Sequence, residues 1–82
     1  MQQTIRTPNQ LGQLLQTQRR QLKLSQAELG ASAGISQKRQ SALELAPDRI
    51  TVDRLLRLLA ALNLELVIQE KSAGEPATAQ EW

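Results

Sequence analysis

Four polar side chains lie close together where a short helix is expected to begin, and their types are those that hydrogen-bond to nucleic-acid bases. Gln37, Lys38 and Arg39 follow one another, and Ser41 comes one helical turn later. A glutamine amide can contact adenine with two hydrogen bonds, while lysine and arginine donate to guanine. This spacing favours a helix end that enters the major groove of DNA. An ordinary solvated helix face is the alternative interpretation.

Most of the side chains that catalyse reactions or bind metals are missing from this chain. It contains no Cys, His or Tyr, so neither the usual pairs of nucleophile and base nor a Cys/His zinc site can form. The carboxylates are scattered along the sequence. We therefore predict that the protein is not an enzyme and that it binds no metal and no cofactor.

The charged residues are unevenly distributed. Residues 1–45 carry six basic and two acidic side chains, whereas residues 46–82 carry four basic and six acidic ones. The positive half contains the run at residues 37–39, which suits a polyanionic partner such as DNA. No apolar run approaches the ~20 residues of a membrane span, and no signal peptide follows Met1, so we expect a cytoplasmic protein without a membrane partner.

Capping patterns predict four helices that would position these side chains. The predicted helices cover residues 8–22, 26–33, 37–45 and 52–62. Each follows a Ser or Thr that can cap it, and two of these caps have a Gln or Glu three residues later, as in a capping box. Gly34, between the second and third helices, suits a sharp turn because glycine adopts a positive φ at no steric cost.

Leucines at helical spacing indicate which helix faces would be buried. The first helix is expected to bury its face through Leu11, Leu14, Leu15 and Leu22. The fourth helix is expected to do so through Leu55, Leu56, Leu59 and Leu62.

After Asn63 the apolar residues recur at every second position, which is typical of a β-strand over about residues 64–70. A lone strand leaves its backbone groups unpaired, and an 82-residue chain without disulfides needs further stabilisation. Pairing with the same strand of a second copy would meet both needs, so we predict a homodimer. The alternative is an extended arm packed on the fourth helix. The residues expected to form the dimer are Leu64, Leu66, Val67 and Ile68.

The last residues differ in composition from the rest of the chain. Residues 1–70 would form one DNA-binding and dimerisation domain, and residues 71–82 a flexible tail rich in Ala, Glu and other small or polar residues. This tail ends in Trp82, the only aromatic residue. Because tryptophan is enriched at binding hot spots, we expect Trp82 to anchor a second protein. The alternatives are that Trp82 folds back on its own dimer or has no role.

The run from Ser25 to Glu44 resembles the helix-turn-helix proteins of the Xre/Cro family, which include the lambdoid repressors. The resemblance implies a mainly α, lambda-repressor-like domain of four to five helices, whose third helix reads DNA, followed here by one C-terminal β-strand that pairs across a homodimer. The residues that match the family pattern are Ser25, Gln26, Glu28, Leu29, Gly34, Ile35, Ser36, Ser41, Leu43 and Glu44.

The resemblance also implies roles for single residues. Gln26 would anchor a phosphate, Gln37 and Lys38 would be the main base readers, and Arg19 would pair with Glu44 and touch phosphate. Two positions depart from the family: Gly30 replaces the usual Ala, which weakens a helix by up to about 1 kcal/mol, and Gln40 replaces a buried Ile or Val. Gln40 would either reach DNA or bond within the fold. The full set of expected DNA-binding residues is Arg19, Gln26, Ser36, Gln37, Lys38, Arg39, Gln40 and Ser41.

The order of four helices, one strand and a polar tail ending in Glu-Trp resembles the HipB-type antitoxins. This resemblance implies a dimer that binds palindromic double-stranded operator DNA, represses its own toxin–antitoxin operon and holds a HipA-type Ser/Thr kinase toxin, with Trp82 as the contact. One alternative is a free-standing Xre-family repressor without a toxin. Another is a protein–protein adaptor that uses the fold without binding DNA.

Overall fold

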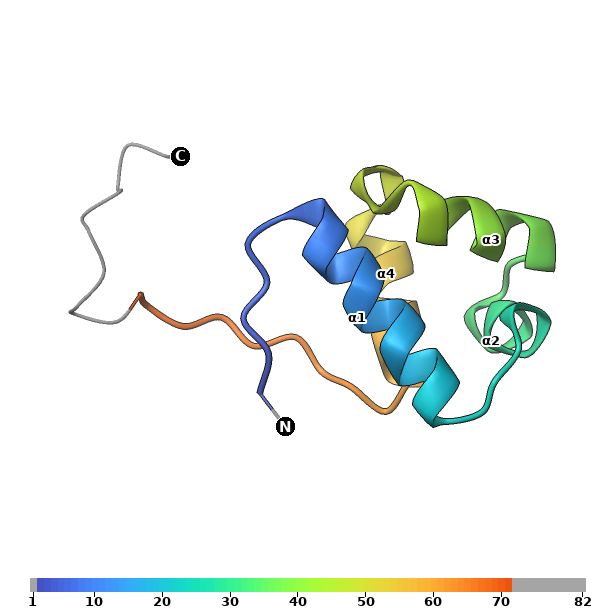
Figure 1. Cartoon of the computed structure of the whole chain (residues 1–82), viewed down its shortest axis with the longest axis horizontal. Coiled ribbons are helices and arrows are strands. Elements are labelled where there is room, and N and C mark those ends of the chain that lie inside the picture. The colour runs from blue at the N-terminus through green and yellow to red at the C-terminus, as the bar shows by residue number, and fades with distance from the viewer. Residues whose placement is uncertain (1, 72–82) are drawn as a thin grey trace.

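The computed structural model describes residues 2–71, which form four α-helices and one short 3-10 turn (Figure 1). Each predicted helix is confirmed to within one residue at either end. The 3-10 turn, at the proline that ends the third helix, was not predicted. In chain order the elements are α1 (Pro8–Gln21), α2 (Gln26–Ala33), α3 (Gln37–Leu45), η1 (Pro47–Arg49) and α4 (Val52–Ala61).

All four helices begin at the predicted caps. At the start of α2 the Ser25 hydroxyl accepts from the backbone N–H of Glu28 at 3.0 Å, and the Glu28 carboxylate accepts from the N–H of Ser25 at 2.9 Å. Thr7 and Gln10 form the same reciprocal pair at the start of α1. Such caps typically stabilise a helix start by about 1 kcal/mol each. This local bonding explains why the helix starts are readable from the sequence.

The ends of α2 and α4 also follow from local chemistry. Gly34 adopts φ +78°, which confirms the predicted left-handed turn after α2. After α4, Asn63 takes a similar conformation with φ +60°, which asparagine tolerates better than most residues. The next backbone N–H, of Leu64, then bonds to the carbonyl of Leu59 at 2.8 Å. The side chain of Gln18 in α1 donates to the carbonyl of Leu62 at 3.1 Å, so α1 also caps α4.

The core lies between α1, α2 and α4, while α3 packs against α1 and α2 on one side of it (Figure 1). On α4, Leu58 is fully buried, whereas Leu56, which we predicted to be buried, is 48% exposed. The prediction was wrong because the buried stripe starts at Leu55 and follows the spacing i, i+3, i+4, i+7. Leu22 is likewise 42% exposed, because it lies past the end of α1. The buried core residues are Leu15, Leu29, Ala33, Leu58, Leu59 and Leu62.

Gly30 lies where α2 approaches the turn into α3. A Cβ atom at this position would lie 2.7 Å from the backbone oxygen of Ile35 and 3.2 Å from that of Ser36. Gly30 departs from the residue usual in the resembled family and lowers the helix propensity of α2, but it allows a close approach of two backbone segments.

Residues 64–71 leave α4 as an extended trace (Figure 1). Leu64 packs against the core, but no β-strand occurs between residues 2 and 71. The structure differs here from the predicted strand at residues 64–70. The physical reason is that a strand requires a hydrogen-bonded partner, and the partner predicted for these residues is a second copy of the chain.

Candidate nucleic-acid interface

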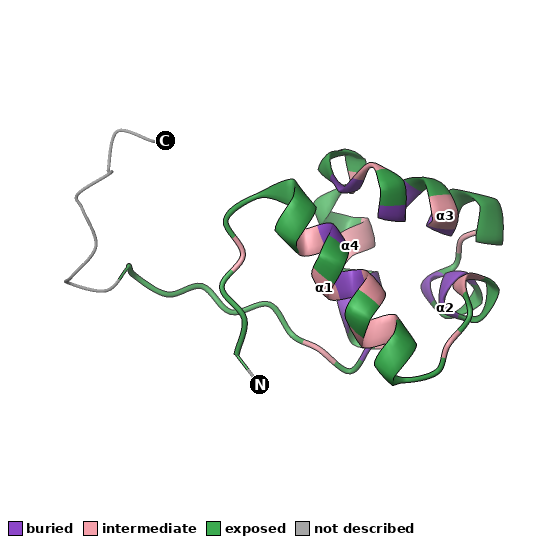
Figure 2. Ribbon diagram, in the orientation of Figure 1, coloured by how far each residue is buried: buried purple, intermediate pink, exposed green. Residues whose placement is uncertain are grey.

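The turn at Gly34 places the predicted reading residues at the start of α3. Gln37, Lys38 and Arg39 occupy the first turn of α3 and are exposed, and Ser41, one turn on, is half-buried. Figure 2 shows this end of α3 as an exposed surface, with the buried side of the helix turned toward the other helices. Neither Lys38 nor Arg39 forms an ion pair within residues 2–71, so both charges are available to a partner.

The opposite side of α3 is buried and partly polar. Leu43 is 7% exposed, Glu44 is 7% exposed and Gln40 is 0% exposed. The expectation that Gln40 contacts DNA is therefore wrong. The alternative expectation, that Gln40 forms a hydrogen bond within the fold, is confirmed. Its amide Nε2 donates to Glu44 Oε2 at 2.8 Å. The physical reason is helical spacing, because Gln40 lies three and four residues before Leu43 and Glu44, on the inward face.

Glu44 is paired with Arg19 of α1, as the family resemblance implied. Arg19 Nε donates to Glu44 Oε2 at 2.9 Å and Arg19 Nη2 to Oε1 at 3.2 Å, in a two-pronged contact. A third bond runs from Arg19 Nη1 to the carbonyl of Leu24 at 2.9 Å. The two side chains are only 11% and 3% exposed. Arg19 therefore joins α1 to α3 inside the fold, and this leaves little of its guanidinium accessible to a phosphate.

The environment of Glu44 stabilises its charged form. Burial favours the neutral acid, but hydrogen bonds from Arg19, Gln40 and Gln26, together with the charge of Arg19, outweigh it. The pKa of the Glu44 carboxyl is consequently held below its ordinary value of 4.5. The carboxylate is therefore ionised at neutral pH, which suits an anchor for several hydrogen-bond donors.

A chain of amide contacts connects this buried ion pair to the exposed surface. Gln26, at the start of α2, donates through Nε2 to Glu44 Oε1 at 3.2 Å. Its Oε1 accepts from Nε2 of Gln37 at 3.0 Å. The sequence suggested Gln26 only as a phosphate anchor and did not reveal this link, because the partners are 11 and 18 residues away. The exposed Gln37 side chain is thereby hydrogen-bonded to the same network as Glu44.

Comparison with known proteins agrees with this arrangement. The helix-turn-helix family HTH_3 matches residues 15–69. This chain belongs to the Xre-type helix-turn-helix family. No curated protein matches the chain.

Among solved structures, this family member is similar to HipB. A complex of a HipB variant with an O2 20mer has 30% sequence identity and a TM-score of 0.80, covering 88% of this chain and 100% of that chain. A complex of HipB with an O4 20mer has 30% identity and a TM-score of 0.79, covering 87% of this chain and 100% of that chain. A chain described as MDT protein matches with the same values. The HipB-like, mainly α fold expected from the sequence is confirmed.

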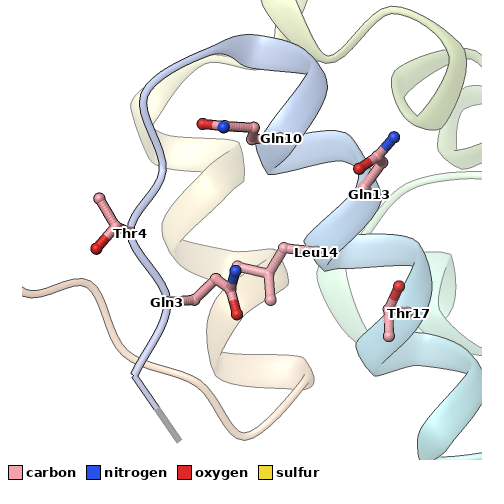
Figure 3. A pocket seen from close by; sticks show the side chains of 6 residues that line it. All are labelled: Gln3, Thr4, Gln10, Gln13, Leu14 and Thr17. Carbon is pink, nitrogen blue, oxygen red and sulfur yellow. The ribbon is translucent and has the colours of Figure 1, made fainter.

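Other surfaces of this Xre-type domain carry less chemistry. A groove of about 320 Å³ lies between the N-terminal segment and α1 (Figure 3). Its lining consists of amides, hydroxyls and one leucine, and includes none of the predicted site residues: Gln3, Thr4, Gln10, Gln13, Leu14 and Thr17. Within residues 2–71, no cluster of three or more metal-binding side chains occurs. In the same part of the chain, no helix has the length and apolar run needed to cross a membrane.

The remaining predicted site residues lie toward the C-terminus. Leu64 is half-buried, whereas Leu66, Val67 and Ile68 are 54%, 64% and 90% exposed. Trp82, the predicted toxin contact, and nearly all of the predicted tail lie outside the described residues.

Proposed function

We propose that this protein is a sequence-specific DNA-binding repressor that reads its operator with the first turn of α3. The observation that carries the proposal is the exposed run of Gln37, Lys38 and Arg39 at the start of the second helix of a helix-turn-helix. The first of these residues, Gln37, is hydrogen-bonded to Gln26 of the preceding helix. The similarity to HipB structures that contain 20mers supports it. Because a repressor must reach DNA, we also propose that the protein is located in the cytoplasm.

In the proposed interface the residues divide into readers and positioners. Gln37 keeps its Oε1 and one N–H of its amide for a base, the acceptor and donor that match adenine. Lys38 would read guanine, with Arg39 and Ser41 as further contacts. Ser36 and Gln26 lie at the starts of α3 and α2, where backbone N–H groups favour a phosphate. Arg19 would act chiefly by holding α3 against α1.

Replacement of Lys38 by alanine tests the reading role. We expect Lys38→Ala to weaken operator binding by about 1–3 kcal/mol and to relax the preference at one or two base pairs. A matched control is Arg57→Ala, which removes the same charge from α4 and should leave base preference unchanged. The measurement is binding to a panel of single-base operator variants at fixed salt, since salt alone changes affinity. Unchanged operator affinity and base preference in Lys38→Ala would show that Lys38 does not read the operator.

We further propose that two copies pair through residues 64–70 and bind a palindromic operator. The support is the exposure of three apolar side chains in this extended segment, Leu66, Val67 and Ile68. On α4, Val52 and Leu56 are also 69% and 48% exposed. Such apolar surface is costly in a monomer and is removed from water when a second copy covers it.

A charge introduced into the paired strands should separate the two copies. We expect Ile68→Asp to give a monomer, because the carboxylate would enter an apolar contact between copies. Gln69→Asp adds the same charge on the other face of the segment and should remain dimeric. Light scattering after size-exclusion chromatography distinguishes the two. A dimeric Ile68→Asp would contradict strand pairing.

We propose finally that the protein is an antitoxin whose partner is a HipA-type kinase, held by Trp82. The support is the HipB-like fold together with Trp82, the only aromatic residue in the sequence. The alternative is a free-standing Xre-family repressor without a toxin partner.

The role of the terminal residue is separable from DNA binding. We expect Trp82→Ala to weaken binding of a HipA-type kinase from the same host by about 2 kcal/mol or more, as for a hot-spot residue. Operator affinity should be unchanged, and Trp82→Phe should lose less. Titration of the purified kinase onto each variant measures this. Failure of the unchanged protein to bind that kinase would favour the free-standing repressor.

A further inference from the structure

Gln40 is an unusual residue for its place in the fold. It is 0% exposed on the inward face of α3, where the resembled family carries an apolar residue. Its Oε1 has no hydrogen-bond partner within residues 2–71. A buried acceptor without a partner lowers stability, so packing alone does not explain a glutamine here. The one bond that Gln40 does make indicates what it contributes.

That bond completes the set of donors around Glu44. Glu44 Oε2 accepts from Arg19 at 2.9 Å and from Gln40 at 2.8 Å. Glu44 Oε1 accepts from Arg19 and from Gln26, both at 3.2 Å. Each carboxylate oxygen thus has two donors, which matches its two lone pairs. With both oxygens occupied on two sides, the carboxylate plane is held in one orientation.

The amide side chains of Gln26 and Gln37 connect the oriented carboxylate to the surface. Because Glu44 Oε1 is an acceptor, Gln26 must turn its Nε2 inward and its Oε1 toward Gln37. Gln37 must in turn donate from Nε2 to that oxygen. The Gln37 amide is therefore fixed in one of its two orientations, with Oε1 and the second N–H left for a base.

We propose that Gln40 is a positioning residue that sets the base preference of Gln37 from inside the fold. The inference rests on the proposed DNA-binding function and deepens it. Without the Gln40 donor, Glu44 Oε2 has an empty lone pair, and only Arg19 and Gln26 hold the carboxylate in place. Gln26 then has a less tightly held acceptor, and the Gln37 amide bonded to it turns more easily. A freely turning amide presents donor and acceptor in either order, so it distinguishes adenine less well.

The test is Gln40→Met, which keeps the length of the side chain but removes both polar atoms. We expect its preference for adenine at the position read by Gln37 to fall about three- to tenfold, the worth of one hydrogen bond. The fold loses one bond but also one unpaired acceptor, so the melting temperature should stay within about 8 °C of the unchanged protein. The probes are palindromic duplexes selected from a random pool with the unchanged protein, and their single-base variants.

Two further variants separate positioning from general damage. Combining Gln40→Met with Gln37→Ala should cost no more preference than Gln37→Ala alone, because Gln40 acts through Gln37. Leu43→Met, a buried change on α3 outside the network, should leave the preference intact. In the NMR spectrum, the side-chain amide protons of Gln37 should shift in Gln40→Met and keep their positions in Leu43→Met.

The outcomes that overturn the inference are distinct from those that overturn the proposed function. If Gln37→Ala loses base preference and Gln40→Met keeps it, the positioning role is wrong and DNA reading stands. If neither Gln37→Ala nor Lys38→Ala changes binding, α3 is not the reader. If both Gln40→Met and Gln40→Ile unfold, Gln40 serves the core alone and the inference is overturned.

Discussion

Replacement of Arg19 by alanine is expected to lower the free energy of unfolding by about 3–5 kcal/mol, the range for breaking a buried ion pair. The two side chains are 11% and 3% exposed, so loss of Arg19 leaves the Glu44 carboxylate buried without a counter-charge. The carbonyl of Leu24 loses its side-chain donor as well. Urea unfolding at pH 7 measures the loss. Because the fold lowers the pKa of Glu44, its contribution to stability is complete above the ordinary value of 4.5, and it is lost only as the pH falls below that value.

Two comparisons make this prediction specific. Arg19→Lys keeps the charge but not the two-pronged contact, so it should lose less than Arg19→Ala. Arg57→Ala breaks the exposed pair with Asp53, whose side chains are 57% and 73% exposed, and should change stability by at most about 1 kcal/mol. Equal losses in Arg19→Ala and Arg57→Ala would show that the buried pair has no special weight.

Replacement of Gly30 by alanine is expected to destabilise the protein by about 3 kcal/mol, at the upper end for overpacking. Helix propensity alone predicts the opposite sign, a gain of up to about 1 kcal/mol. We expect the steric effect to outweigh helix propensity, because the added Cβ would lie 2.7 Å from the backbone oxygen of Ile35. That oxygen cannot move without shifting the turn that leads into α3. Thermal unfolding of the purified variant gives the sign directly.

Gly12 offers the matched control for this substitution. A Cβ there would lie 2.8 Å from the Pro47 ring, which is a side chain. Gly12→Ala should therefore lose less stability than Gly30→Ala, since a change of ring pucker can move Pro47 Cγ while the backbone of Pro47 stays in place. A Gly30→Ala variant that is as stable as the unchanged protein would mean that α2 and α3 can separate without cost.

The parts of this fold that could be predicted from the sequence are those set by near neighbours. A capping box joins residues three apart, as Ser25 and Glu28 do, and a left-handed turn depends on one residue, Gly34. The polar network was less accessible, because Arg19 and Glu44 are 25 residues apart. That pair was expected only through the family resemblance. The sequence does not decide whether the Gln40 side chain points toward DNA or into the fold. Its partner in the fold, Glu44, is expected to pair with Arg19, so nothing marks Glu44 as a second partner for Gln40.

The candidate site was predicted in the same uneven way. The exposed run at residues 37–39 follows from helix position, which the caps define. The bond between Gln26 and Gln37 depends on how α2 and α3 are packed, and no spacing rule covers two residues on separate helices. The strand predicted at residues 64–70 is absent from the described residues, and the partner that we propose for it is a second copy of the chain.

The junction after α4 has a consequence for how operators of this kind can diverge. The bond from the Leu64 N–H to the Leu59 carbonyl and the bond from Gln18 to the Leu62 carbonyl fix the point at which residues 64–71 leave the helices. In the proposed dimer, substitutions after this point alter the distance between the two copies of α3 without touching their base contacts. Half-site spacing and half-site sequence are then independent traits, which mutation can change one at a time.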